Sequence, residues 1–187
     1  MTITVVTQAG SPAVTLDQAK RHLRYVLSDQ DDLIGLYVQV ATTHVQRICE
    51  FAIGQQVWML TLDAFPATIE LPGGAVSAVT TVAYVDQSGT DQSLQPTDFR
   101  LDSKSTPARL TPTSAQGWPF TAPVTNAVSV TYTVGSDDVP APLKSAILLI
   151  AGDLFENRQQ IDMDSRAVVA ESPTVRRLIF PYRRVLP

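Results

Sequence analysis

The chain changes its sequence pattern twice along its length, and this change limits the possible folds more than any other feature. Apolar residues recur at helical spacing within residues 16–51, and the same spacing returns after residue 139. In between, residues 55–135 form short runs rich in β-branched and aromatic side chains, separated by turn signals. We therefore predict an α+β protein in which a small antiparallel β-barrel or sandwich is inserted in a helical bundle.

The same pattern predicts three segments. Residues 1–54 would form an N-terminal arm and a pair of helices, the first of which starts at a capping box made by Thr15 and Gln18. Residues 55–135 would form the inserted antiparallel β-domain of five to seven strands. Residues 136–187 would form a C-terminal helix and a docking tail, and we expect this segment to pack with residues 1–54.

The second predicted helix, which ends near Gly54, has one apolar face. We expect that face to contain Leu33, Leu36, Tyr37, Val40, Ala41, His44, Ile48 and Phe51. On such a face His44 is a core or interface side chain rather than a metal ligand, and Cys49 is a buried thiol. Gly35 interrupts this helix at a cost of about 1 kcal/mol relative to alanine, which suggests close packing against a neighbour.

Composition excludes several classes of protein. One cysteine excludes an internal disulfide and a cysteine-built metal site, and no apolar run reaches the roughly 18 residues of a membrane span. The N-terminus lacks the pattern of a signal peptide, so we expect a soluble protein of a reducing compartment. Residues 1–155 hold 8 basic and 14 acidic side chains, whereas residues 156–187 hold 6 arginines and 4 acids. This asymmetry suggests a cationic tail that contacts a partner.

Motifs for catalysis or for cofactor binding are largely absent. The chain has neither the Gly-x-Ser-x-Gly elbow of hydrolases nor the Gly-Lys-Ser/Thr of a phosphate-binding loop. Asp29, Asp31 and Asp32 lack the spacing of a calcium loop and are better explained as helix-capping groups. Asp137 and Asp138 could be half of a metal or acid–base site, but capping of the following helix is the favoured interpretation. We predict a protein that is not an enzyme and that has no cofactor and no metal.

One aromatic loop remains as a possible binding feature. Trp118 and Phe120 lie in a proline-rich stretch with little periodicity. Trp118 could belong to a partner-binding surface for protein or sugar, or it could close the end of the β-domain core, and the sequence leaves both alternatives open.

Several short motifs follow one another in a set order. They are Leu16-Asp17-Gln18-Ala19-Lys20-Arg21-His22-Leu23-Arg24, Asp31-Asp32-Leu33-Ile34, Leu62-Asp63-Ala64-Phe65-Pro66, Ile69-Glu70-Leu71-Pro72-Gly73-Gly74, Trp118-Pro119, Val139-Pro140-Ala141-Pro142-Leu143 and Leu178-Ile179-Phe180-Pro181-Tyr182-Arg183. Together, over about residues 15–184, they resemble the head–tail connector (adaptor) proteins of long-tailed bacteriophages and prophages, in the branch with a β-domain inserted in a helical bundle.

This resemblance implies a structural role in the neck of a virion, after synthesis in the cytoplasm of the bacterial host. Such proteins form a ring, usually of twelve copies, below the portal protein. The ring extends the DNA channel, through which DNA passes without sequence-specific binding, and receives the downstream stopper or tail-terminator protein. No membrane is involved. An acidic body suits a channel lining, because like charge keeps DNA from adhering.

The resemblance also suggests which residues contact the portal. Arginine and apolar side chains of the tail suit docking onto a preformed partner. The candidates are Arg176, Arg177, Leu178, Ile179, Phe180, Tyr182, Arg183 and Arg184. We expect deletion of residues 174–187 to abolish portal binding and to leave the fold intact. The alternative function is that of another tail-completion or baseplate component whose β-domain binds protein or sugar.

Overall fold

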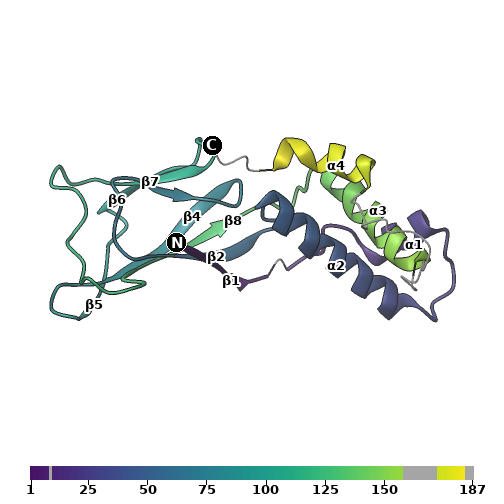
Figure 1. Cartoon of the computed structure of the whole chain (residues 1–187), viewed down its shortest axis with the longest axis horizontal. Coiled ribbons are helices and arrows are strands. Elements are labelled where there is room, and N and C mark those ends of the chain that lie inside the picture. Colours follow the sequence, from purple (N-terminus) through teal and green to yellow (C-terminus); the bar gives the residue numbers. More distant parts are fainter. Residues whose placement is uncertain (9, 158–171, 184–187) are drawn as a thin grey trace, which may run out of the picture. The chain divides into compact units, whose positions relative to one another are not determined.

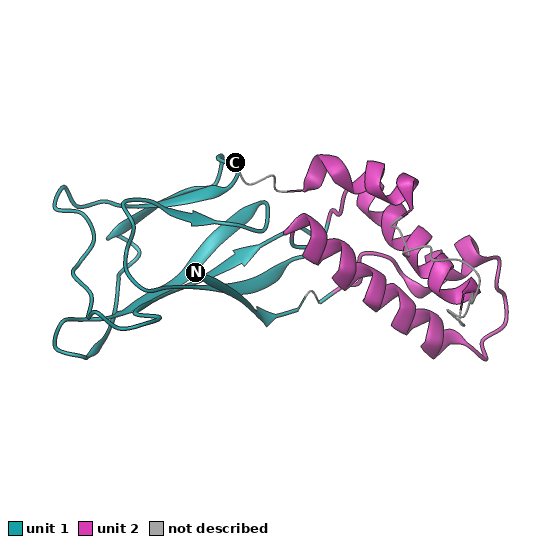
Figure 2. Cartoon of the chain, viewed as in Figure 1, with its two compact units in different colours: residues 1–10, 52–137 teal, residues 11–51, 138–187 magenta. Residues whose placement is uncertain are grey.

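The computed structural model describes residues 1–8, 10–157 and 172–183. It confirms a mixed α+β protein with antiparallel sheets. The chain divides into two compact units, each described here by itself: unit 1 comprises residues 1–10 and 52–137, and unit 2 comprises residues 11–51 and 138–187 (Figure 2). Arg184 and residues 161–171, on which predictions from the sequence fall, lie outside the described residues.

Unit 1 contains two antiparallel sheets. The larger has the strand order β1-β2-β8-β4-β5, formed by β1 (Thr2–Thr7), β2 (Gln56–Leu62), β8 (Val128–Val134), β4 (Val76–Val85) and β5 (Asp91–Ser93) (Figure 1). The smaller has the order β3-β7-β6, formed by β3 (Ile69–Leu71), β7 (Ala108–Pro112) and β6 (Phe99–Asp102). Neither sheet closes into a barrel among the described strands.

The N-terminal arm is the edge strand of the larger sheet. β1 pairs with β2 in antiparallel register, from Thr2 opposite Thr61 to Thr7 opposite Val57. For this reason residues 1–10 group with unit 1 rather than with the helices that follow them. The sequence indicated an extended segment here, but the partner strand lies some 50 positions away and leaves no local signal.

One hydrophobic core serves both sheets of unit 1. Alternate residues of β8, namely Val128, Val130, Tyr132 and Val134, are fully buried, which confirms the alternation predicted from the sequence. Leu71 and Leu110 of the smaller sheet belong to the same core cluster. Two buried polar side chains of this core are paired: the Tyr132 hydroxyl donates to the Pro72 carbonyl at 3.1 Å, and the Trp58 indole N–H donates to Gln56 Oε1 at 2.8 Å.

Unit 2 is helical. It contains α1 (Leu16–Leu23), α2 (Asp31–Cys49), α3 (Ala141–Glu156), α4 (Pro173–Ile179) and the short 3₁₀ turn η1 (Phe180–Tyr182). The predicted capping box is confirmed: the Gln18 N–H donates to Thr15 Oγ1 at 3.3 Å, and the Thr15 N–H donates to Gln18 Oε1 at 3.0 Å. Lys20 on α1 forms an ion pair with Asp31 at the start of α2, with a distance of 2.6 Å between Nζ and Oδ1.

The prediction for the buried face of α2 was wrong in part. The core side chains are Ile34, Val38, Ala41, Val45 and Cys49, whereas Leu36, Val40 and His44 are exposed. His44 is therefore not a core histidine of this chain. Apolar residues surround more than half of this helix, so periodicity alone could not select the side that packs against its neighbours.

The prediction for the start of α3 was also wrong in one respect. Its N-cap residue is Pro140, and no side chain forms a cap hydrogen bond there, so neither Asp137 nor Asp138 caps this helix. Asp137 instead accepts a long hydrogen bond of 3.5 Å from the backbone N–H of Gln55. Pro142 lies in the first turn of α3, as predicted. Proline suits this position because a backbone N–H in the first turn has no acceptor inside the helix, so the N–H that proline lacks is not missed.

The turn between β4 and β5 is organised by one carboxylate. Asp86 accepts hydrogen bonds from the Ser88 hydroxyl, the Thr90 backbone N–H and the Gln92 side-chain amide. These donors stabilise the charged form and lower the pKa of Asp86 from 3.8 to about 2.

We therefore expect the β4–β5 turn to lose order in acid. Because the folded pKa is depressed, the contribution of Asp86 is complete above its unfolded pKa of 3.8 and is lost as the pH falls through about 2. A carboxyl-detected NMR titration should give a pKa near 2 for Asp86, and Ser88→Ala should raise it toward 3.8. An unchanged pKa in Ser88→Ala would contradict the assignment of the Ser88 hydroxyl as the main cause.

Candidate functional site

The candidate partner-binding residues of the C-terminus lie on a short helix that is anchored in unit 2. Val175 and Ile179 of α4 are buried, with exposed fractions of 3% and 0%. The Ile179 carbonyl contacts Cys49 Sγ at 3.9 Å, and the Tyr182 ring packs edge-on against Phe51, with ring centroids 6.1 Å apart. The inner side of α4 and η1 is thereby tied to the C-terminal end of α2.

The outer side of α4 and η1 presents cations and one aromatic ring. Arg176, Phe180 and Arg183 recur at a spacing of four and three residues, and Arg177 is adjacent to them; all four are exposed. We call these four residues the α4 face. Within residues 1–8, 10–157 and 172–183, no carboxylate forms an ion pair with these arginines. Their guanidinium groups can therefore meet the carboxylates of a partner protein.

The remaining predicted tail residues fall into two groups. Ile179 is completely buried and belongs to the core of unit 2, whereas Leu178 and Tyr182 are half-buried. Deletion of residues 174–187 would also remove the buried side chains of Val175 and Ile179, so we now expect it to destabilise unit 2. Point substitutions on the α4 face are the appropriate test.

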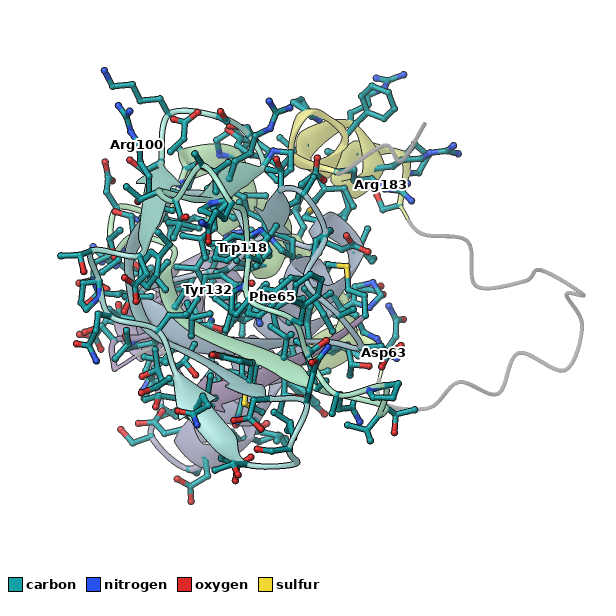
Figure 3. The ribbon with its side chains drawn as sticks, turned by 90° about the vertical axis from the view of Figure 1, so that its left-hand side faces the viewer. Asp63, Phe65, Arg100, Trp118, Tyr132 and Arg183 are labelled. Carbon is teal, nitrogen blue, oxygen red and sulfur yellow. The ribbon has the colours of Figure 1, made fainter. Side chains whose placement is uncertain are left out.

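Unit 1 has a second candidate surface, built on an aromatic cluster. The Trp118 ring stacks on Phe65 with centroids 4.9 Å apart and planes inclined by 8°, and Phe65 packs edge-on against Tyr84 at 5.6 Å (Figure 3). Trp118 is half-buried, whereas Phe120 is 81% exposed. The indole N–H of Trp118 is buried and has no hydrogen-bond partner in the part of the chain that the structure describes.

The aromatic cluster borders an open hollow of about 470 Å³, lined in part by Tyr84, Leu94, Asp98, Gln116, Trp118 and Phe120. Trp118 and Phe120 were predicted from the sequence as a partner-binding loop, whereas Phe65 and Tyr84 were not. In the sequence Phe65 belongs only to one of the motifs of the family resemblance, and its stack with Trp118 joins residues that lie more than 50 positions apart. The hollow provides apolar contact and polar groups, but no set of converging acid and base groups.

Other chemistry-bearing side chains do not gather into a site. Among the described residues no three His, Cys, Asp or Glu side chains could hold a metal ion together. Asp29 accepts a hydrogen bond from the Tyr25 hydroxyl at 2.5 Å within the connection between α1 and α2, and Asp31 at the start of α2 is paired with Lys20 of α1. The predicted capping role of these acids was wrong, because the N-cap residue of α2 is Gln30 and no side chain forms a cap hydrogen bond there. No described helix is long and apolar enough to span a bilayer.

Among the described residues, the exposed groups form two candidate docking surfaces, the α4 face and the hollow beside Trp118. Residues 13–99 match the family model of the phage gp6-like head-tail connector proteins, which confirms the resemblance predicted from the sequence for this part of the chain. The matched region covers α1, α2 and residues 52–99 of unit 1. No curated protein matches the chain significantly in sequence.

Solved structures of neck proteins share the whole fold. A chain in the neck of an empty GTA particle, computed with C6 symmetry, superimposes with a TM-score of 0.78 at 24% identity, covering 100% of this chain and 98% of that chain. A chain of the virion of a native gene transfer agent particle gives 0.76 at 24% identity, and one of the native neck computed with C12 symmetry gives 0.70 at 23%, both with the same coverage. At these identities the likeness establishes the fold.

Proposed function

We propose that the protein is a structural, non-enzymatic head–tail connector of a virion neck. The match of residues 13–99 to the gp6-like connector family carries this proposal. The fold shared with neck proteins over the full chain supports it, because it extends the match to α3, α4 and the rest of unit 1. In this role several copies assemble as a ring that joins the portal of the head to the stopper or tail-terminator protein and extends the channel for DNA.

Within this role we assign the α4 face to the contact with the portal protein. Arg176, Arg177, Phe180 and Arg183 combine fork-shaped cations with an exposed aromatic ring, and such residues dominate the binding energy of protein interfaces. The buried side of α4 holds them on a helix that is formed before binding, which lowers the entropic cost of association. Arg184, the last predicted member, would extend the same basic segment.

The alternative role, a tail-completion or baseplate component, depends on unit 1. The two sheets of unit 1 share one core, which supports its description as a small sandwich, and the hollow beside Trp118 and Phe120 offers a surface for protein or sugar. If this role is correct, Trp118→Ala removes ligand binding while heads and tails still join. If the connector role is correct, Trp118→Ala acts on stability alone.

The connector role is tested by deleting the gene from the phage or prophage that carries it and imaging the particles. DNA-filled or leaking heads beside separate, complete tails are expected, because the joint is missing. Normal tailed particles would refute the connector role and direct attention to the hollow of unit 1.

The α4 face is tested by complementing that deletion with substituted genes. Arg176→Glu with Arg177→Glu should fold normally, because both side chains are exposed and surface changes shift stability by only about 0.5 kcal/mol. Joined particles should fall by about 30-fold or more, the effect of losing about 2 kcal/mol at an interface hot spot. The matched control is Arg100→Glu on β6, an exposed arginine of unit 1 (Figure 3). Full complementation by the double variant would exclude the α4 face as the portal contact.

A further inference from the structure

All the basic side chains of unit 1 line a single hollow. Residues 1–10 and 52–137 contain seven acidic side chains but only three basic ones, Arg100, Lys104 and Arg109. These three lie on β6, in the loop after it and on β7, and they border an open hollow of about 640 Å³, which we call the basic hollow. All three are exposed, and the Arg100 side chain points away from the core (Figure 3). A unit that is acidic as a whole thus carries one concentrated basic site.

The three cations of the basic hollow have no partner of their own in the described part of the chain. None of their side chains donates a hydrogen bond or forms an ion pair there. The one carboxylate that lines the hollow, Asp102, accepts hydrogen bonds from the Ser105 hydroxyl and from the Lys104 backbone N–H, and so shapes the turn after β6. Glu70 of β3 lies opposite Arg109 in the sheet but does not border the hollow. Even with both acids counted, the cations remain in excess.

The two arginines form a pair on one face of the smaller sheet. Arg100 is opposite Thr111 and Arg109 is opposite Asp102, so Arg100 and Arg109 are diagonal neighbours on adjacent strands. Diagonal neighbours in an antiparallel pair lie about 7–8 Å apart. One strand of DNA carries a phosphate about every 3.4 Å along its axis. The pair therefore spans about two phosphates of one strand.

The other lining residues favour phosphate over the carboxylates of a protein. Thr68, Ser103 and Thr111 add hydroxyl groups, and Leu101 is the single apolar side chain among the described lining residues, which include no aromatic ring. Protein interfaces depend on buried apolar or aromatic anchors, as on the α4 face, whereas contacts to the DNA backbone come from Arg, Lys, Ser and Thr. The basic hollow has the second set of groups and lacks the first.

We propose that the basic hollow contacts the phosphate backbone of DNA without reading its sequence. The proposal rests on the proposed connector role, in which DNA passes along the protein, and it names the surface that meets the DNA. Arg100 and Arg109 bind adjacent phosphates and Lys104 adds a third charge. The acidic remainder of unit 1 repels the duplex on either side, so the contact is confined to two or three phosphates and DNA can move past it.

An NMR titration of the full chain with a DNA duplex of about 12 base pairs at about 50 mM salt tests the proposal. The signals of Arg100, Lys104 and Arg109 should shift on addition of DNA. Affinity should fall about 10- to 40-fold between about 50 and 200 mM salt, because two to three phosphates are neutralised. DNA-induced shifts that leave these three residues unchanged overturn the proposal.

A double substitution tests the arginine pair directly. Arg100→Gln with Arg109→Gln should fold normally, because both side chains are exposed, and should bind DNA about tenfold more weakly or worse. The slope of log affinity against log salt concentration should become less steep by about 2. The matched control, Arg21→Gln with Arg47→Gln, removes the same charge from exposed positions of unit 2 and should change the affinity less than about twofold. Equal losses in both variants would show that net charge alone attracts DNA, which contradicts the proposal.

Two competitors at matched ionic strength separate the DNA backbone from other anions. Neither poly-glutamate nor inorganic phosphate should displace the duplex from the basic hollow. Displacement by poly-glutamate as readily as by unlabelled DNA would identify an acidic protein segment as the occupant. Displacement by inorganic phosphate would identify a small free anion. Either result overturns the assignment to DNA.

These outcomes are distinct from a failure of the connector role. The basic hollow is not part of the joint between head and tail, so Arg100→Glu should join heads to tails and yet bind DNA weakly. If deletion of the gene separates heads from tails but Arg100→Gln with Arg109→Gln binds DNA as the unchanged protein does, the connector role stands and the assigned DNA contact is wrong. If the basic hollow binds DNA but deletion of the gene leaves normal tailed particles, the phosphate contact stands and the connector role is wrong.

Discussion

Replacing Gly135 by alanine is expected to destabilise the protein by about 2–5 kcal/mol. Gly135 directly follows β8 and has a φ of +84°, a region that costs roughly 1–2 kcal/mol for other residues. An added Cβ would lie 2.2 Å from the backbone oxygen of Gly54 and 3.1 Å from Ala52 Cβ, so the backbone itself would have to move. Such overpacking costs roughly 1–3 kcal/mol more. Thermal unfolding should show a melting temperature lower by roughly 5–15 °C.

Gly117→Ala is the matched control for this prediction. Gly117 has the same φ of +84°, but an added Cβ there meets no atom within 4 Å. Its substitution should therefore cost only the backbone term of about 1–2 kcal/mol. The difference between the two variants measures the steric contact alone. Equal losses in both variants would show that the contact between Gly135 and Gly54 does not constrain the fold.

Ile179→Ala is expected to cost about 2–5 kcal/mol of stability, the usual cost of truncating a buried isoleucine. Ile179 is 0% exposed, and Val175 and Ile179 are the only side chains of α4 that are buried among the described residues. Loss of this anchor should also weaken partner binding, since α4 carries the exposed arginines. Denaturant unfolding measures the stability, and complementation of the gene deletion measures the function.

Phe180→Ala provides the opposite case at the neighbouring position. Phe180 is 63% exposed, so its truncation should change stability by no more than about 0.5 kcal/mol. We expect it to reduce head–tail joining nevertheless, because an exposed aromatic ring beside arginines is a typical interface anchor. If Phe180→Ala lowers stability as much as Ile179→Ala, the burial pattern of α4 would be incorrect.

Features that depend on near neighbours could be predicted from the sequence. The capping box of Thr15 and Gln18 involves groups three residues apart, so the start of α1 was predicted correctly. The alternation of Val128, Val130, Tyr132 and Val134 identified a strand and its buried face, because only one face of β8 is apolar. The ordered motifs over about residues 15–184 carried the resemblance to head–tail connectors, and the family model matches residues 13–99 of this range.

Features that depend on distant neighbours could not be predicted. β1 joins a strand more than 50 positions away, and Trp118 stacks on Phe65 across a similar separation. The sequence grouped Ile179 with the docking residues, whereas the structure buries it against α2. The sequence also predicted that Leu36 and Val40 belong to the buried face of α2, whereas both side chains are exposed. In both helices the apolar residues occupy more than one side, so periodicity leaves the buried side undetermined.

The sequence by itself thus determined the class of fold, the positions of most helices and strands, and the family resemblance, because hydrophobic periodicity, caps and turn residues act over a few positions. Only the tertiary structure decided which apolar side chains remain on the surface, because that choice depends on which elements pack against each other. This choice separates the buried anchor Ile179 from the exposed α4 face, and it leaves Leu36 and Val40 of α2 exposed.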